Sequence, residues 1–324
     1  MKKFLTALLL PALSLSAFAQ DPFQIPAILS KPDSSAFRAY VLAATKTAIR
    51  YKTTPQGVDF TDAKISDFAT IFIMEPIDYS AAVDLYEGRK YAEAKEQFAK
   101  LKELYKPISA MKDNFSTLSA FYELECMRKL GDYEGLAAAL KSFLKEPLSR
   151  DHQLRQLDLY VMWDAVRAAD WPRLLLIASE RDDEALPGYQ RAQVAYCKGL
   201  ALDKLERGSE ALIEYSVAMT ADSGASELIT KQAGLNALGV YFRDEEVQIA
   251  IQNWGTEDEN KNSPGFTRLT EAAALAVLYE KYLSLGEPLP ANLKAFKKYA
   301  ADLPEAAPKE EKPEEEKPED DKSE

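Results

Sequence analysis

The chain has 324 residues, of which 47% are hydrophobic and 28% charged, so it holds enough apolar material for two ordinary domains or one elongated array. Glycine is sparse, at 13 residues, and this composition favours helices over sheets. The formal net charge is −12, which makes nucleic acid and anionic membrane surfaces poor partners because both are negatively charged.

The first nineteen residues predict a secretory signal peptide. Lys2 and Lys3 form a positive start, residues 4–15 are apolar, and the segment Ala17-Phe18-Ala19 offers small residues for cleavage after Ala19. At 1.5 Å per residue, residues 4–19 reach about 24 Å, short of a hydrocarbon core of roughly 30 Å. We therefore expect an exported protein, periplasmic or secreted, with no direct membrane insertion after signal cleavage.

Residues 20–36 contain three prolines and predict an extended leader. Residues 37–75 predict a small antiparallel β module, either SH3-like or a meander, because short apolar or alternating runs occupy 40–42, 48–52, 58–60 and 71–73. A sheet this small is marginally stable alone, so we expect it to pack against the segment that follows.

The segment from Leu85 to Phe98 has the pattern of two short antiparallel helices. Gly88 permits the turn, Tyr91 opens the second helix, Ala94 allows close helix crossing and Phe98 fills the space four residues later. The same pattern recurs at Leu130–Tyr133, at Ala169–Trp171 and around Gly199. Equivalent positions fall at 91, 133, 171 and 208, in steps of 42, 38 and 37 residues. The residues that define this repeat are Gly88, Tyr91, Ala94, Phe98, Gly131, Tyr133, Trp171, Gly199, Ala211 and Tyr215.

Residues 76–303 thus resemble tetratricopeptide (TPR) repeats, with loop-extended copies in place of the usual 34-residue step. The resemblance implies a mainly α fold: an open α-solenoid of TPR-like hairpins with a concave groove lined by the first helix of each pair. It also implies a secreted scaffold of a Gram-negative-type bacterium that contacts other proteins. The final segment, 304–324, has ten acids and four lysines, and this composition predicts a disordered acidic tail.

The sequence contains no residue set that specifies a reaction. His152 is the only histidine, no Gly-x-Ser-x-Gly motif is present, and Asp258–Asn262 lacks the glycine and the glutamate of a calcium loop. Cys126 and Cys197 fall within helical patterns and are expected to be buried thiols. We therefore predict no enzyme activity, no metal and no cofactor. The sequence still leaves open the alternative that two carboxylates act as a pair in glycoside hydrolysis.

The most suggestive surface is aromatic. If the first helices face the groove, it presents flat rings and cations that suit a peptide or a sugar face. The alternative is that the rings pack between helices. The candidate partner-binding residues are Tyr79, Tyr86, Tyr122, Arg128, Tyr160, Trp163, Arg167 and Tyr196. The sequence therefore favours an extracytoplasmic protein–protein interaction scaffold for envelope assembly or maintenance, with a carbohydrate-binding module or weak glycoside hydrolase as the alternative.

Overall fold

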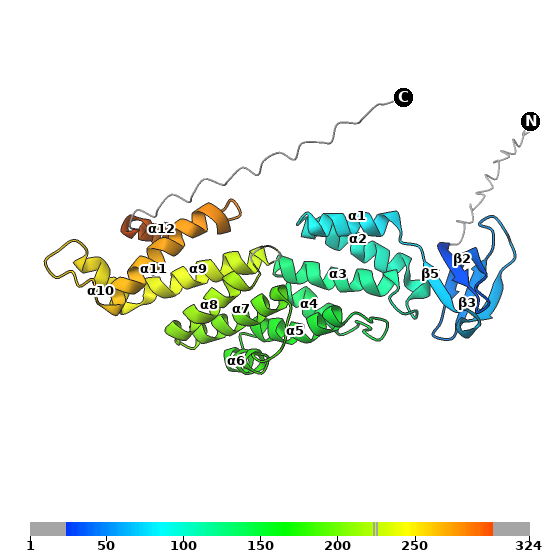
Figure 1. Cartoon of the computed structure of the whole chain (residues 1–324), viewed down its shortest axis with the longest axis horizontal. Coiled ribbons are helices and arrows are strands. Elements are labelled where there is room, and N and C mark those ends of the chain that lie inside the picture. Colours follow the sequence, from blue (N-terminus) through cyan, green and yellow to red (C-terminus); the bar gives the residue numbers. More distant parts are fainter. Residues whose placement is uncertain (1–23, 223, 225, 301–324) are drawn as a thin grey trace, which may run out of the picture. The chain divides into compact units, whose positions relative to one another are not determined.

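The computed structural model describes residues 24–222, 224 and 226–300 (Figure 1). The chain forms two compact units, Met1–Asp158 and Leu159–Glu324, and each is described by itself. The predicted signal peptide (1–19) and acidic tail (304–324) lie outside the described residues. No helix within the described ranges is both long enough and apolar enough to cross a membrane.

The first unit begins with a five-stranded antiparallel sheet of order β4-β3-β2-β1-β5, which confirms the predicted small β module. The third predicted strand, at 58–60, is wrong in position. Val58 is 88% exposed there, and the strand begins three residues later. The strands are β1 (Ile25–Ser30), β2 (Ala36–Ala44), β3 (Ala48–Lys52), β4 (Thr61–Lys64) and β5 (Thr70–Ile73).

The strand β1 lies within the segment that was predicted to be a leader, so the sheet starts earlier than expected. Its prolines argued against a strand, because proline lacks the N–H that a ladder needs. The register places Pro26 where the missing N–H costs little. The carbonyl of Pro26 accepts from the N–H of Met74 at 2.9 Å, just beyond the last residue of β5. The alternating residues Ile25, Ala27 and Leu29 are fully buried, which fixes the strand in the sheet.

The inner face of the sheet and the first helices share one hydrophobic core. Phe37, Tyr51 and Phe68 form a cluster of rings with centroids 5.8 to 6.5 Å apart at one side of the sheet. Because so few strands bury little area alone, this shared core accounts for the stability of the β module. The helices of this unit are α1 (Ile77–Glu87), α2 (Tyr91–Leu104), the short η2 (Lys106–Ile108), α3 (Phe115–Leu130) and α4 (Tyr133–Leu140).

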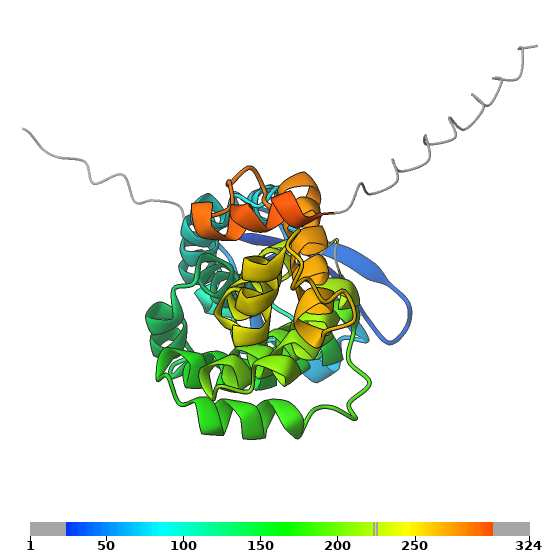
Figure 2. The ribbon, with the colours of Figure 1, turned by 90° about the vertical axis from the view of Figure 1, so that its left-hand side faces the viewer.

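The second unit is helical throughout its described part, and from α6 to α11 each helix packs against the next. The helix α5 (Asp151–Arg167) runs from the end of the first unit into the second. Figure 2 shows the C-terminal turns running across α11 in the second unit. The other elements are α6 (Trp171–Ser179), α7 (Gly188–Lys204), α8 (Gly208–Ala221), α9 (Glu227–Arg243), α10 (Glu245–Asn253), α11 (Pro264–Leu278), η3 (Tyr279–Leu283), α12 (Ala291–Lys294) and η4 (Ala295–Tyr299).

Four hairpin turns have the same backbone conformation. In each, one residue has a positive φ: 63° at Arg89, 72° at Gly131, 52° at Ala169 and 63° at Glu206. The amide of the next residue bonds the carbonyl five positions earlier, as in the turn from Lys90 to Leu85 at 2.9 Å. This is the Schellman arrangement, which closes a helix C-terminus with main-chain bonds. The four residues are 42, 38 and 37 positions apart, so the steps predicted from side chains are also the steps of the backbone.

The side chains predicted to define the repeat occupy matching places. Tyr91, Tyr133 and Trp171 each begin the second helix of a hairpin, as Gly208 does in the fourth. Phe98 is fully buried, and Ala94, Ala211 and Tyr215 are likewise inaccessible. Gly88 is the C-cap of α1 and Gly131 that of α3. At Gly199, a Cβ atom would lie 2.9 Å from Cδ1 of Tyr215, so glycine lets α7 and α8 approach closely.

Candidate functional site

The predicted partner-binding tyrosines of the first unit lie in its interior. Tyr79 is only 7% exposed, and its ring contacts Phe98, Phe115 and Tyr122 at centroid distances of 6.0, 4.9 and 6.4 Å. Tyr122 is half-buried and stacks on Phe98 at 5.1 Å. Burial raises the pKa of the Tyr79 hydroxyl above its usual range. These rings pack α1, α2 and α3 together.

The predicted cation of this unit is also interior. The guanidinium of Arg128 forms two bonds to the carboxylate of Glu125, at 2.7 and 2.9 Å, and the two side chains are 4% and 7% exposed. The hydroxyl of Tyr86 donates to the same carboxylate at 3.3 Å. Burial, and then the charge of Glu125, raises the pKa of Tyr86. Arg128 therefore neutralises a buried acid of its own helix.

The candidate rings of the second unit are likewise enclosed. Tyr160 and Trp163 are 1% and 2% exposed, and the indole of Trp163 donates to the Oε1 atom of Gln193 at 3.1 Å. Tyr196 is 8% exposed, with its ring centroid 6.1 Å from that of Trp163. Arg167 lies nearer the surface and pairs with Asp164 at 2.9 Å.

The expectation that these rings line an open groove is therefore wrong for Tyr79, Tyr160, Trp163 and Tyr196. Their faces are covered by neighbouring helices, as the packing alternative requires. Tyr86 and Tyr122 are half-buried and are also engaged with other side chains. Both cysteines are buried, as expected, and burial raises the pKa of the Cys126 thiol to about 12.

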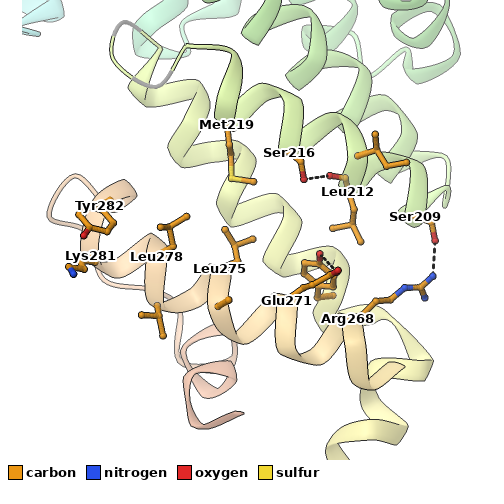
Figure 3. A pocket seen from close by; sticks show the side chains of 14 residues that line it. Ser209, Leu212, Ser216, Met219, Arg268, Glu271, Leu275, Leu278, Lys281 and Tyr282 are labelled. Carbon is orange, nitrogen blue, oxygen red and sulfur yellow. Dashed lines mark hydrogen bonds between the residues drawn. The ribbon is translucent and has the colours of Figure 1, made fainter. Parts of the chain in front are cut away.

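An open apolar groove lies elsewhere in the second unit, between α8 and the segment formed by α11 and η3 (Figure 3). The helix α9 packs against both α8 and α11, and it contributes Tyr241 to the lining. The groove has a volume of about 990 Å³. That is the upper end of the size range typical of ligand pockets, so the groove suits a bulky occupant.

The walls of the groove are aliphatic. Ile213 on α8 and Leu278 on α11 are 64% and 45% exposed, and Tyr282 of η3 is 60% exposed. In Figure 3, Leu212 and Met219 of α8 point toward Leu275 and Leu278 of α11 across the open space. Large apolar side chains gathered at this exposure mark a surface suited to a partner.

Polar groups lie at the two ends of the groove (Figure 3). At one end Arg268 pairs with Asp244 at 2.8 Å and bonds the hydroxyl of Ser209 at 3.3 Å. Beside it the hydroxyl of Tyr241 donates to Glu271 at 3.0 Å, and burial raises the pKa of that tyrosine. At the other end the ammonium of Lys281 lies 5.0 Å from the ring centre of Tyr282. The middle of the groove is therefore apolar and its ends are charged.

Sequence reasoning did not identify this groove. On α8, Leu212 and Met219 are seven positions apart and share one face, a spacing that is equally typical of a buried helix face. Only the placement of α9 and α11 decides that this face stays open. The one indication in the sequence was that α8 carries more large apolar residues than a single neighbouring helix can cover.

The chain matches no protein-family profile, no curated protein and no solved structure. Within the described ranges, no three His, Cys, Asp or Glu side chains are grouped so as to hold a metal ion. His152 is exposed in the first turn of α5, where partial burial and then Arg150 lower its pKa.

Proposed function

We propose that this protein is an extracytoplasmic protein-binding scaffold of TPR-like helical hairpins, and that the groove between α8 and α11 holds a segment of a partner protein. The predicted signal peptide supports the location, and the four equivalent hairpin turns support the stacking of hairpins into a solenoid. The observation that carries the binding role is the groove itself. It leaves Ile213, Leu278 and Tyr282 exposed on two facing elements.

The partner segment is an amphipathic helix. A helix that lies in an apolar groove presents anchors at positions i, i+3, i+4 and i+7, and aliphatic walls on two sides match such a stripe. Met219 adds a flexible, polarisable side chain that adapts to different anchors. The middle of the groove is apolar, so the buried face of the partner helix carries leucine-like side chains there.

Charge sets the orientation of the partner. Lys281 forms no ion pair with any residue in the described part of the chain, and it stands at one end of the groove. Arg268, at the other end, is already matched by Asp244 and Glu246. An acidic residue near one end of the partner helix therefore pairs with Lys281, and this contact fixes the direction of binding.

The test uses a displayed library of 20-residue amphipathic helical peptides, selected on the full chain. Methyl NMR of the protein then locates the bound peptide: methyl signals of Ile213, Met219 and Leu278 are expected to shift, and those of Leu176 to stay in place. Ile213→Asp is expected to weaken binding at least about tenfold, because it places a charge in the apolar wall.

Leu176→Asp is the matched control. Leu176 on α6 is 61% exposed, close to the 64% of Ile213, but it does not line the groove. Equal losses of binding in the two variants, or selected peptides that shift no groove methyl, would refute the proposal. If a second copy of the chain fills the groove, the protein will dimerise and Ile213→Asp will abolish the dimer. This result would also overturn the proposal. A glycan array covers the carbohydrate alternative, and it is expected to remain silent.

A further inference from the structure

The strand β5 is an edge of the sheet with unused hydrogen-bonding groups. The N–H of Met74 bonds the carbonyl of Pro26, which lies directly opposite, so the residues at 70, 72 and 74 turn their main-chain groups toward β1. Ile71 and Ile73 therefore direct their N–H and C=O groups away from the sheet. Within the described ranges no partner bonds the main chain of either residue.

Apart from its short length of four residues, this edge lacks the features that normally protect an edge strand. Its sequence is Thr-Ile-Phe-Ile, without charge or proline, and all four residues favour β structure. Phe72 is 57% exposed and lies directly opposite Ile28, itself 40% exposed, so the outer face beside the edge is apolar. An added strand would therefore gain both main-chain bonds and side-chain contacts.

A cavity of about 540 Å³ opens beside the start of β5 and is lined in part by Thr70 and Ile71. Two exposed lysines, Lys46 and Lys112, and one glutamate, Glu146, also line it. Neither lysine forms an ion pair with any residue that the structure describes. The edge thus carries local positive charge on a chain whose net charge is −12.

From this geometry we infer that β5 is a second docking site, which binds an extended segment of a partner protein by strand addition. The segment pairs antiparallel or parallel with β5 through the main chains of Ile71 and Ile73. An acidic side chain of the segment enters the cavity and pairs with Lys46 and Lys112. This mode takes its affinity from main-chain bonds and its specificity from the charged pocket. The site is independent of the groove between α8 and α11.

The first test is amide hydrogen exchange of the full chain by NMR. The probes are eight-residue peptides of Thr, Val, Ile and Tyr that carry one glutamate, at the N-terminus or at the C-terminus. A matched set of peptides carries lysine in place of the glutamate. On binding a glutamate peptide, the amides of Ile71 and Ile73 are expected to gain at least about tenfold protection, because they acquire hydrogen bonds. The amide of Phe72 already bonds β1 and serves as the internal control.

The second test exchanges the charges of the cavity. Lys46→Glu with Lys112→Glu is expected to weaken the glutamate peptides by at least about tenfold and to strengthen the lysine peptides. The matched control is Lys100→Glu with Lys141→Glu, which makes the same charge change at exposed sites away from the cavity. Both variants leave the core of the sheet intact, so a lost interaction is not a lost fold.

Three results would overturn the inference. The first is peptide binding that leaves the amides of Ile71 and Ile73 unprotected. The second is equal weakening by the cavity and control variants. The third is protection that rises with protein concentration in the absence of peptide, because the edge would then pair with β5 of a second copy. None of these outcomes depends on Ile213 or Leu278, so failure here is distinct from failure of the groove.

Discussion

Replacing Arg128 with methionine should destabilise the first unit far more than the loss of an ordinary ion pair. The change removes the guanidinium partner of the Glu125 carboxylate in a site where the Glu125 side chain is 7% exposed, although the hydroxyl of Tyr86 still donates to it. Removing one partner of a buried pair costs about 3–5 kcal/mol, because the other charge stays desolvated. With a urea dependence of about 2 kcal/mol per molar, the midpoint should fall by about 1.5–2.5 M.

The assay is urea unfolding followed by pulsed hydrogen exchange and mass spectrometry of peptides from α1 to α3. This readout reports on the first unit directly. The three tryptophans, Trp163, Trp171 and Trp254, all lie in the second unit, so their fluorescence would not do so.

The double variant Glu125→Met with Arg128→Met tests the reasoning. It removes both charges together, and the hydroxyl of Tyr86 loses its acceptor at a cost of about 1 kcal/mol. Arg207→Met is the surface control: Arg207 forms the same type of i,i+3 pair with Glu210, but the two side chains are 46% and 54% exposed, and little change is expected. A double variant as unstable as Arg128→Met alone would refute the argument that the unpaired charge is the cause.

Two further predictions concern glycine packing and tyrosine burial. Gly199→Ala should lower stability by about 1–3 kcal/mol, because the added Cβ would meet the buried ring of Tyr215. Gly239→Ala should be neutral or stabilising, because its Cβ would meet only the flexible end of Arg243. Thermal unfolding followed by tryptophan fluorescence measures both. Burial raises the pKa of Tyr86 and Tyr241 in the folded protein above the value of 10.0 in the unfolded chain. The stability of the folded state is therefore unaffected by these groups below pH 10.0 and should fall as the pH rises above it. The part of the tyrosinate absorbance at 295 nm that Tyr86→Phe and Tyr241→Phe remove should therefore appear together with unfolding; its appearance in a fully folded chain would contradict this.

The sequence predicted local features well because short-range geometry determines them. The positions of Tyr91, Tyr133 and Trp171 as first residues of second helices followed from small and aromatic residues a few positions apart. The strand β1 was missed because Pro26 argues against a strand unless its register is known. That register depends on β5, which lies more than forty residues further along the chain.

The open groove could not be predicted, because a helix sequence does not reveal which of its apolar faces a neighbour covers. Tyr160 and Trp163 were expected at a groove and are buried, whereas Ile213 and Leu278 were not singled out and are exposed. An apolar stripe on a helix shows which face of that helix is suited to burial. Whether it is buried depends on helices distant in sequence, here α9 and α11.

The four equivalent hairpin turns have a consequence for how this chain can change in length. Only one of the four left-handed positions is glycine; the others are Arg89, Ala169 and Glu206, so main-chain bonds rather than residue identity define the turn. The steps of 42, 38 and 37 residues differ while the turn itself is constant, and the longest step contains the longest of the three second helices, α2 with 14 residues against 8 in α4 and 9 in α6. A whole hairpin is therefore a unit that duplication or deletion can add or remove without rebuilding any turn.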